Sequence, residues 1–268
     1  MKIDGKRVLI TGGSSGIGRS LATMLLEKGA KVVINGRREG LLEKTVSELT
    51  QVSAFISSIA ADVATPAGRD ATLNHAMTVL GGLDVLVNNA GAVRAGRLEN
   101  ITENEIQQMI EVDLVAPILL TRSALPALKA SGEALVVNIA SGIALVGAPF
   151  YATYAATKAG LARFGEALRR ELIGESVHIL TVYPGATDTP MMASNRAGPE
   201  LGFEREPASA VAQAVIAGIE SDSLEIIRGG DVRAQMIALN RENPSLIDQR
   251  FLSLKAILED AVREHSSL

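Results

Sequence analysis

The stretch Arg7-Val-Leu-Ile-Thr-Gly-Gly-Ser-Ser-Gly-Ile-Gly18 decides the fold, because a short apolar run enters a glycine-rich turn and a helical pattern follows at once. Glycines allow a tight turn and let backbone N–H groups approach a phosphate, while a helix N-terminus favours negative charge. The spacing of Gly12, Gly16 and Gly18 is not Gly-x-Gly-x-x-Gly, and no Gly-Lys-Ser/Thr follows, which disfavours a triphosphate loop. The stretch therefore predicts a strand, a turn for the pyrophosphate of a dinucleotide, and a helix. The alternative is a glycine-rich turn without a ligand.

Short apolar runs recur along the rest of the chain. They are rich in Val, Ile and Leu with little strict alternation, which is typical of strands covered on both faces. Segments with helical spacing lie between them, and this order predicts a parallel, doubly wound α/β sheet with right-handed crossovers. The expected strands are 7–11, 31–35, 54–60, 84–88, 134–140, 177–183 and 224–227, and the longest expected helices are 103–129 and 152–172.

The length of 268 residues accommodates one large domain. Residues 1–230 contain all the expected strands and are predicted to form one dinucleotide-binding domain. Residues 231–268 read as a helical extension of two helices, separated by Asn243-Pro-Ser245. The second helix carries an apolar stripe, so we expect the extension to pack on the same domain or on a neighbouring subunit.

The composition excludes several classes of function. The chain has no cysteine and three widely separated histidines, which leaves no thiol nucleophile and no spacing typical of a metal site. The net charge of −4, with both signs interspersed, disfavours nucleic acid and anionic membranes as partners. No run of 18 apolar residues and no signal peptide is present, so we expect a cytoplasmic protein without a membrane span.

Five motifs in register resemble the short-chain dehydrogenase/reductase family. They are Thr11-Gly12-x-x-x-Gly16-x-Gly18, Asn88-Asn-Ala-Gly91, Ser141, Tyr154-Ala-Ala-Thr-Lys158, and Pro184-Gly185 followed by Thr189. Each motif alone is common, but the ordered set over residues 6–190 is specific. The resemblance implies a Rossmann-type, seven-stranded parallel sheet in three αβα layers. It also implies NAD(P)-linked interconversion of a carbonyl and an alcohol.

The same resemblance implies a set of cofactor-binding residues. It places the adenine near Asp62, the nicotinamide ribose near Tyr154 and Lys158, and the nicotinamide ring near Thr189. The expected set is Gly12, Ser14, Ser15, Gly16, Ile17, Gly18, Arg37, Asp62, Val63, Asn89, Ala90, Gly91, Tyr154, Lys158, Pro184, Gly185, Thr187 and Thr189.

The end of the second expected strand bears on the choice between NAD and NADP. An acidic residue near this point takes the ribose hydroxyls of NAD, whereas this chain has Asn35-Gly-Arg-Arg38. The Arg37 guanidinium can contact a 2′-phosphate, so we predict that NADP(H) is favoured over NAD(H). The alternative is a solvated arginine at a helix start. Many NADP-preferring family members also have a basic residue where this chain has Ser15, so Arg37 carries the preference.

Tyr154 and Lys158 lie four residues apart and therefore share one helix face. A positive charge about 4 Å from a phenol, at an effective dielectric of about 20, contributes about 4 kcal/mol, or about three pKa units. We therefore expect Lys158 to lower the pKa of Tyr154 toward about 7, where acid/base catalysis is effective. The resemblance implies that Tyr154 is the general acid/base and that Ser141 positions the carbonyl oxygen.

Asp113 departs from the family pattern. The family usually has asparagine in a stretch like Val-Asn-Leu, where this chain has Val112-Asp-Leu114. An ionised aspartate accepts hydrogen bonds but cannot donate them. We keep Asp113 as a catalytic candidate with three readings: tolerated variation, a shifted pH optimum through Lys158, or impaired catalysis.

The substrate is less constrained by the sequence. The segments 142–150 and 189–192 are largely apolar, which predicts an uncharged or lipophilic carbonyl or alcohol, or alternatively a packed lid. Arg94 and Arg97 are candidates for an anionic substrate or simply exposed loop residues. The resemblance implies a homodimer or homotetramer. Two other functions stay open: a weakly catalytic nucleotide-binding, redox-sensing module, and an epimerase or dehydratase that retains its cofactor.

Overall fold

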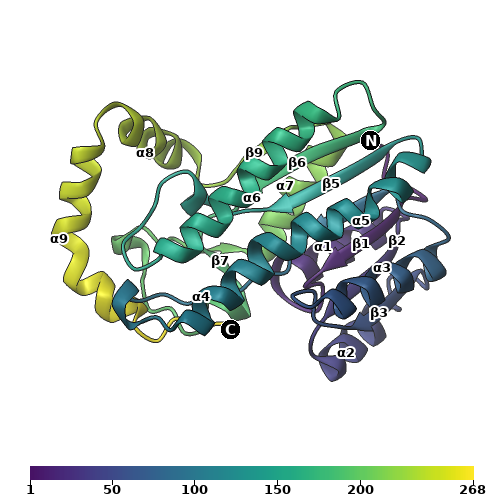
Figure 1. Ribbon diagram of the computed structural model, residues 1–268, viewed down its shortest axis with the longest axis horizontal. Coiled ribbons are helices and arrows are strands. Elements are labelled where there is room, and N and C mark those ends of the chain that lie inside the picture. Colours follow the sequence, from purple (N-terminus) through teal and green to yellow (C-terminus); the bar gives the residue numbers. More distant parts are fainter.

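A seven-stranded parallel sheet lies between two layers of helices in the computed structural model, which describes residues 1–268 (Figure 1). The strand order is β3-β2-β1-β4-β5-β6-β9. The strands are β1 (Arg7–Thr11), β2 (Lys31–Gly36), β3 (Ile56–Ala60), β4 (Val85–Asn88), β5 (Ala134–Ile139), β6 (Val177–Tyr183) and β9 (Glu225–Ile227). The predicted doubly wound sheet is confirmed, and the carboxyl ends of its strands meet at one edge.

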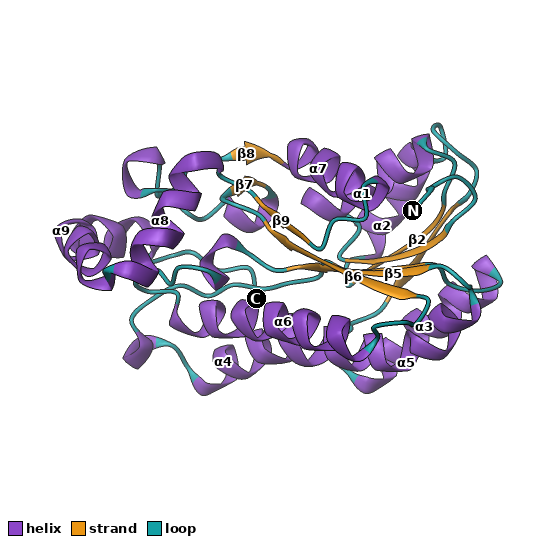
Figure 2. Ribbon diagram, turned by 90° about the horizontal axis from the view of Figure 1, so that it is seen from above, coloured by secondary structure: helices purple, strands orange, loops and turns teal.

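Helices cover both faces of the sheet (Figure 2). One layer contains α1 (Gly16–Glu27), α2 (Glu39–Leu49) and α7 (Ala208–Glu220), and the other contains α3 (Pro66–Leu80), α5 (Ala116–Ala130) and α6 (Ala152–Glu171). In β1, Val8 and Ile10 enter the first hydrophobic core and Leu9 enters the second. Burial on both faces explains why the apolar runs lack strict alternation.

The long helix expected at 103–129 contains one irregular turn. The structure has α4 (Glu103–Ile110), a π-helical turn over Glu111–Val115, and then α5. A π-turn widens the helix by one residue, a feature that the 3.6-residue periodicity used for prediction does not contain. The turn includes Asp113, whose side chain is fully buried.

The helical extension consists of α8 (Gly230–Glu242) and α9 (Pro244–Val262). The end of α9 packs on the same chain, where Leu258 and Val262 join a small hydrophobic core with Val93. Beyond α9, Ser266 forms an antiparallel bridge with Arg94. The extension therefore curves back to the carboxyl edge of the sheet (Figure 1).

Two short elements complete the fold between β6 and α7. The two-residue strands β7 (Thr187–Asp188) and β8 (Glu206–Pro207) pair in parallel beside the main sheet. None of the helices combines the length and the apolar character that a membrane crossing requires.

Candidate active site

A cavity of about 630 Å³ opens at the carboxyl edge of the sheet. Its walls come from the glycine turn after β1 and from the segments that follow β2, β3, β4, β5 and β6. The helices α8 and α9 supply further lining residues. This is the edge at which doubly wound sheets bind their ligands.

Close contacts explain the glycines of the first turn. Gly12 and Gly16 have positive φ values of 65° and 53°, which favour glycine. A Cβ atom on Gly18 would lie only 2.5 Å from both the Gly12 carbonyl oxygen and the Asn89 Nδ2 atom. Glycine at these positions lets the turn, the start of α1 and the segment after β4 approach one another.

Thr11 joins the glycine turn to the Asn88–Gly91 motif. Its Oγ1 atom accepts hydrogen bonds from the backbone N–H groups of Asn89 and Ala90, both at 3.0 Å. In return, the Asn89 side-chain amide donates to the Thr11 carbonyl oxygen at 2.9 Å. These bonds explain why the two motifs occur together.

The turn provides suitable groups for a pyrophosphate. Helix α1 begins at Gly16 and has no acidic residue in its first turn. The first N–H groups of a helix have no intrahelical acceptor. In α1 they include the N–H groups of Gly16 and Ile17, and both residues line the cavity. The unpaired donors and the room left by the glycines fit the dinucleotide expected from the sequence.

The residues expected at the adenosine end lie along the same cavity. Arg37 and Arg38 are exposed at the end of β2, and both line it. Asp62 follows β3 and also lines the cavity, and its Oδ1 atom accepts a hydrogen bond from Ala64 N–H at 3.0 Å. Positive charge therefore predominates at this end.

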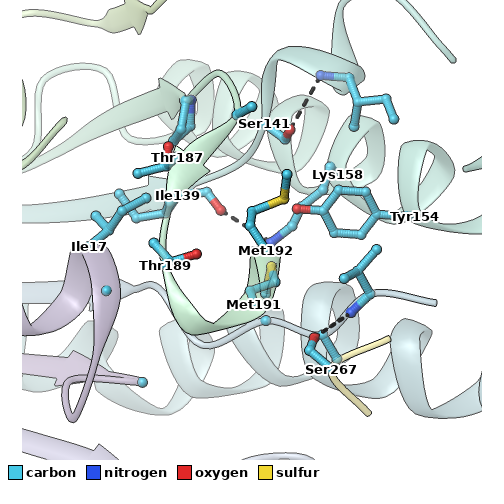
Figure 3. A pocket seen from close by; sticks show the side chains of 18 of the residues that line it. Ile17, Ile139, Ser141, Tyr154, Lys158, Thr187, Thr189, Met191, Met192 and Ser267 are labelled. Atoms are coloured by element: carbon cyan, nitrogen blue, oxygen red, sulfur yellow. Dashed lines mark hydrogen bonds between the residues drawn. The ribbon is translucent and has the colours of Figure 1, made fainter. Parts of the chain in front are cut away.

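The residues expected at the nicotinamide end also line the cavity. Thr187 is held in place by a hydrogen bond from its hydroxyl to the Gly185 carbonyl oxygen at 3.1 Å. Thr189 lies so near the glycine turn that a Cβ atom on Gly16 would be 2.9 Å from its methyl group. Figure 3 shows Thr187, Thr189 and Ile17 on one side of the cavity.

Ser141, Tyr154 and Lys158 lie on the other side of this space (Figure 3). Ser141 follows β5 and caps a short 3₁₀ turn, where its Oγ accepts a hydrogen bond from Ile143 N–H at 3.3 Å. Helix α6 carries the other two, with the Lys158 ammonium 5.7 Å from the centre of the Tyr154 ring. The structure therefore brings together the three residues predicted to perform the chemistry.

Asp113 lies directly behind Lys158. Its Oδ1 atom is 3.5 Å from the Lys158 ammonium, and both side chains are almost completely buried. The same oxygen accepts a hydrogen bond from Ala92 N–H at 2.9 Å, and Oδ2 accepts one from the Thr157 hydroxyl at 3.3 Å. Burial raises the pKa of the Asp113 carboxyl, while the charge of Lys158 opposes this rise.

The expected low pKa of Tyr154 is wrong for the protein chain by itself. Burial and the negative charge of Asp113 raise the pKa of the Tyr154 phenol, and a hydrogen bond with Ser141 only partly opposes this. The expected low value includes the charge of Lys158 but not the burial of the phenol. In the structure, the charge of Lys158 is partnered by the carboxylate of Asp113.

Comparison with known proteins identifies the family. The short chain dehydrogenase family model matches residues 6–200. The chain belongs to this family. It is 33% identical to the ketoacyl reductase HetN of Nostoc over 254 residues, covering 92% of this chain and 88% of the relative. It is also 33% identical to the 3-oxoacyl-[acyl-carrier-protein] reductase FabG of Vibrio cholerae over 224 residues, covering 79% of this chain and 90% of the relative.

Solved structures have the same fold. A short chain dehydrogenase/reductase from Burkholderia phymatum, in complex with NAD, superposes with a TM-score of 0.83 at 24% identity, covering 92% of this chain and 96% of the other. A 3-ketoacyl-(acyl-carrier-protein) reductase from Brucella melitensis, complexed with NADH, has a TM-score of 0.77 at 25% identity, covering 85% of this chain and 98% of the other. Nicotinamide cofactors are thus bound by short chain dehydrogenases of this fold.

Nearly all the residues predicted for the site of this short chain dehydrogenase line the cavity. The two exceptions are Gly18, which packs behind the turn, and Asp113, which contacts Lys158 from the interior. Arg94 and Arg97 do not line it, because they pair with Glu105 and Glu259.

The sequence did not reveal a buried polar cluster beside the cavity. The Asn195 side-chain amide donates a hydrogen bond to the Tyr151 hydroxyl at 2.8 Å, and this hydroxyl donates to His265 Nδ1 at 2.8 Å. His265 Nε2 then donates to the Met191 carbonyl oxygen at 3.1 Å. Burial lowers the pKa of His265, so the neutral imidazole holds the segment after α9 against the cavity wall.

Arg233 and Met236 of α8, and Phe251 and Leu254 of α9, were also missed as lining residues. Both helices come after the last motif of the family pattern, and their apolar spacing predicts only that they pack. No signal in the sequence indicates that they pack over the cavity.

Proposed function

We propose that this short chain dehydrogenase is an NADPH-preferring oxidoreductase that interconverts a carbonyl and a secondary alcohol. One observation supports this above all: Ser141, Tyr154 and Lys158 line the same cavity as the glycine turn. A dinucleotide along the turn would end beside a proton donor and a hydrogen-bond donor.

Each of these side chains has a distinct task in the proposed reaction. When bound, the nicotinamide supplies the hydride for the carbonyl carbon. The Ser141 hydroxyl donates a hydrogen bond to the carbonyl oxygen and fixes its position. The Tyr154 hydroxyl gives its proton to this oxygen as negative charge develops there. Because burial and Asp113 raise its pKa in the protein chain by itself, Tyr154 carries the proton that reduction requires.

Lys158 acts as a positioning group in this scheme. Its ammonium donates a hydrogen bond to the Ile139 carbonyl oxygen at 3.3 Å and contacts Asp113. These contacts fix the amine beside Tyr154, where it can hold the nicotinamide ribose. Asp113 is a second positioning residue, because it does not line the cavity and contacts Lys158 and the backbone N–H of Ala92. Its charge also raises the pKa of Tyr154.

Exchanging Arg37 for aspartate should remove the proposed cofactor preference. The wild-type protein should bind NADPH more tightly than NADH, because the exposed Arg37 guanidinium can pair with the 2′-phosphate. Loss of a charged hydrogen bond, with a carboxylate added, should weaken NADPH binding by about 10- to 100-fold while sparing NADH. Fluorescence titration of both cofactors would measure this.

Arg38→Asp is the matched variant, because Arg38 lines the same end of the cavity. It should change the NADPH/NADH ratio less than Arg37→Asp does. Equal dissociation constants for the two cofactors in the wild-type protein would contradict the proposal.

The proposed substrate has a lipophilic body. The part of the cavity beyond Ser141 and Tyr154 has an apolar lining that includes Ile143, Val146, Met191, Met192, Leu201, Phe203, Met236, Phe251 and Leu254. An acyl chain fits such a lining, and two relatives are named ketoacyl reductases. Oxidation of NADPH, followed by absorbance against ketones, aldehydes and acyl substrates, would test the function. Tight cofactor binding without turnover of any compound would instead favour a nucleotide-binding module.

We also propose how the chain is organised. Residues 1–230 would form the catalytic domain, and residues 231–268 would cover its substrate space from the same chain. The partly exposed side chains of Ile110, Leu114 and Phe164 on the long helices suit a homodimer or homotetramer. Sedimentation equilibrium would give the number of subunits.

A further inference from the structure

The charged residues that line the cavity are unevenly distributed. Asp62 is the only acidic residue of the lining, and it lies at the adenosine end. At the substrate end, α8 contributes Arg233 and α9 contributes Arg250, and no Asp or Glu side chain lines the cavity there. The apolar substrate space therefore carries a positive charge that the proposed function does not yet use.

Arg233 lies close to the catalytic residues. A Cβ atom built on Gly142 would be 3.1 to 3.3 Å from the central carbon and both terminal nitrogens of the Arg233 guanidinium. The planar group therefore lies over Gly142, the residue that directly follows Ser141. Glycine at position 142 leaves the room that this approach requires.

The Arg233 guanidinium has no partner within the chain. It forms no hydrogen bond or ion pair, and its half-buried position lowers its pKa with no neighbouring carboxylate to oppose this. By contrast, Arg228, just before α8, donates to Glu206 at 2.6 Å. A partly desolvated charge without a partner is unfavourable, and a ligand of opposite charge would relieve this.

We propose that Arg233 is an anion-binding residue and that the substrate carries a carboxylate or a phosphate a few bonds from its carbonyl. This inference rests on the proposed function and deepens it, because it adds a charged group to the lipophilic substrate. The guanidinium fork binds either anion through two parallel N–H···O bonds. Arg250, which is exposed and also lines the cavity, adds positive charge that attracts the same ligand.

This anion site is separate from the expected phosphate sites of the cofactor. Those sites are the glycine turn after β1 and Arg37 after β2, whereas Arg233 follows β9. Between β2 and β9 in the sheet lie β1, β4, β5 and β6. A phosphate bound at Arg37 therefore does not satisfy Arg233.

The test compares matched charged and neutral substrates. With NADPH, the wild-type protein should reduce 5-oxohexanoate with a kcat/KM about 10- to 100-fold above that of its methyl ester. In Arg233→Gln this ratio should fall to near one, and Arg233→Lys should retain part of it. Arg241→Gln, at an exposed position on α8 away from the cavity, should keep the wild-type ratio.

A second pair of compounds distinguishes the two anions. The ratio of kcat/KM for dihydroxyacetone phosphate to kcat/KM for dihydroxyacetone measures a preference for phosphate. If the charged compound is preferred in only one of the two pairs, and Arg233→Gln removes that preference, the site is assigned to the anion of that pair. A preference for neutral compounds in both pairs, or ratios that Arg233→Gln leaves unchanged, would overturn the proposal.

A binding measurement separates this proposal from the proposed function. Calorimetric titration of 5-oxohexanoate and its ester into the NADP⁺-loaded protein, which cannot reduce them, should show tighter binding of the acid, lost in Arg233→Gln. If no carbonyl compound is reduced but this difference is found, the proposed reaction fails and the anion site stands. If ketones are reduced with no such difference, the anion site fails and the reaction stands.

Discussion

Tyr154→Phe should lower kcat for carbonyl reduction by about 10²- to 10⁴-fold, the range that a general acid supplies. The variant removes only the hydroxyl, whose proton the proposed reaction transfers. Because the ring remains between its neighbours, the dissociation constant of NADPH should change little. Steady-state kinetics with a ketone and fluorescence titration of NADPH would measure the two effects.

Tyr183→Phe is a matched control for this variant. The Tyr183 hydroxyl donates to Glu225 at 3.2 Å, at the edge of the sheet formed by β6 and β9 and outside the cavity lining. Its loss should lower the free energy of unfolding by about 1 kcal/mol and leave turnover intact. A Tyr154→Phe variant that retains wild-type turnover would refute the assignment of Tyr154.

Much of the fold was predictable because it rests on local patterns. The β1 segment 7–11 and the β6 segment 177–183 match the predicted runs, since strands buried on both faces read as continuous apolar segments. The positions of the motifs follow from topology. Parallel strands end at one edge, so motifs that follow different strands must meet there, as Gly12, Asn89 and Ser141 do.

The remaining features depend on contacts between distant parts of the chain. Tyr151 and His265 are 114 residues apart, yet their side chains share a buried hydrogen bond. Periodicity predicted α8 without indicating that Arg233 lies over Gly142. The prediction for the pKa of Tyr154 is wrong first because the sequence does not show how deeply the phenol is buried. It is wrong also because the Asp113 charge lies on a π-turn that no local pattern reports.

Asp113→Ala should lower the free energy of unfolding by about 3–5 kcal/mol, the usual effect of removing one partner from a buried ion pair. The change leaves the Lys158 ammonium buried without a carboxylate and removes the acceptor of Ala92 N–H. Asp113→Asn should lose less, because its amide oxygen can still accept from Ala92. Chemical denaturation of the wild-type protein and both variants would give the three values. A loss below about 1 kcal/mol for Asp113→Ala would show that the pair does not stabilise the fold.

The more stable variant, Asp113→Asn, also tests whether the carboxylate controls Tyr154. Burial, and then the charge of Asp113, raise the pKa of the Tyr154 phenol. Reduction requires the protonated phenol, so activity persists below this pKa and falls as pH rises through it. Asparagine removes the negative charge and with it one cause of the high pKa. The alkaline limb of the pH profile of kcat for reduction should therefore move to lower pH in Asp113→Asn. Alcohol oxidation needs the deprotonated phenol, so the acidic limb of its pH profile should also move to lower pH. Profiles that coincide with those of the wild-type protein in both directions would mean that Asp113 stabilises Lys158 without acting on the acid/base group.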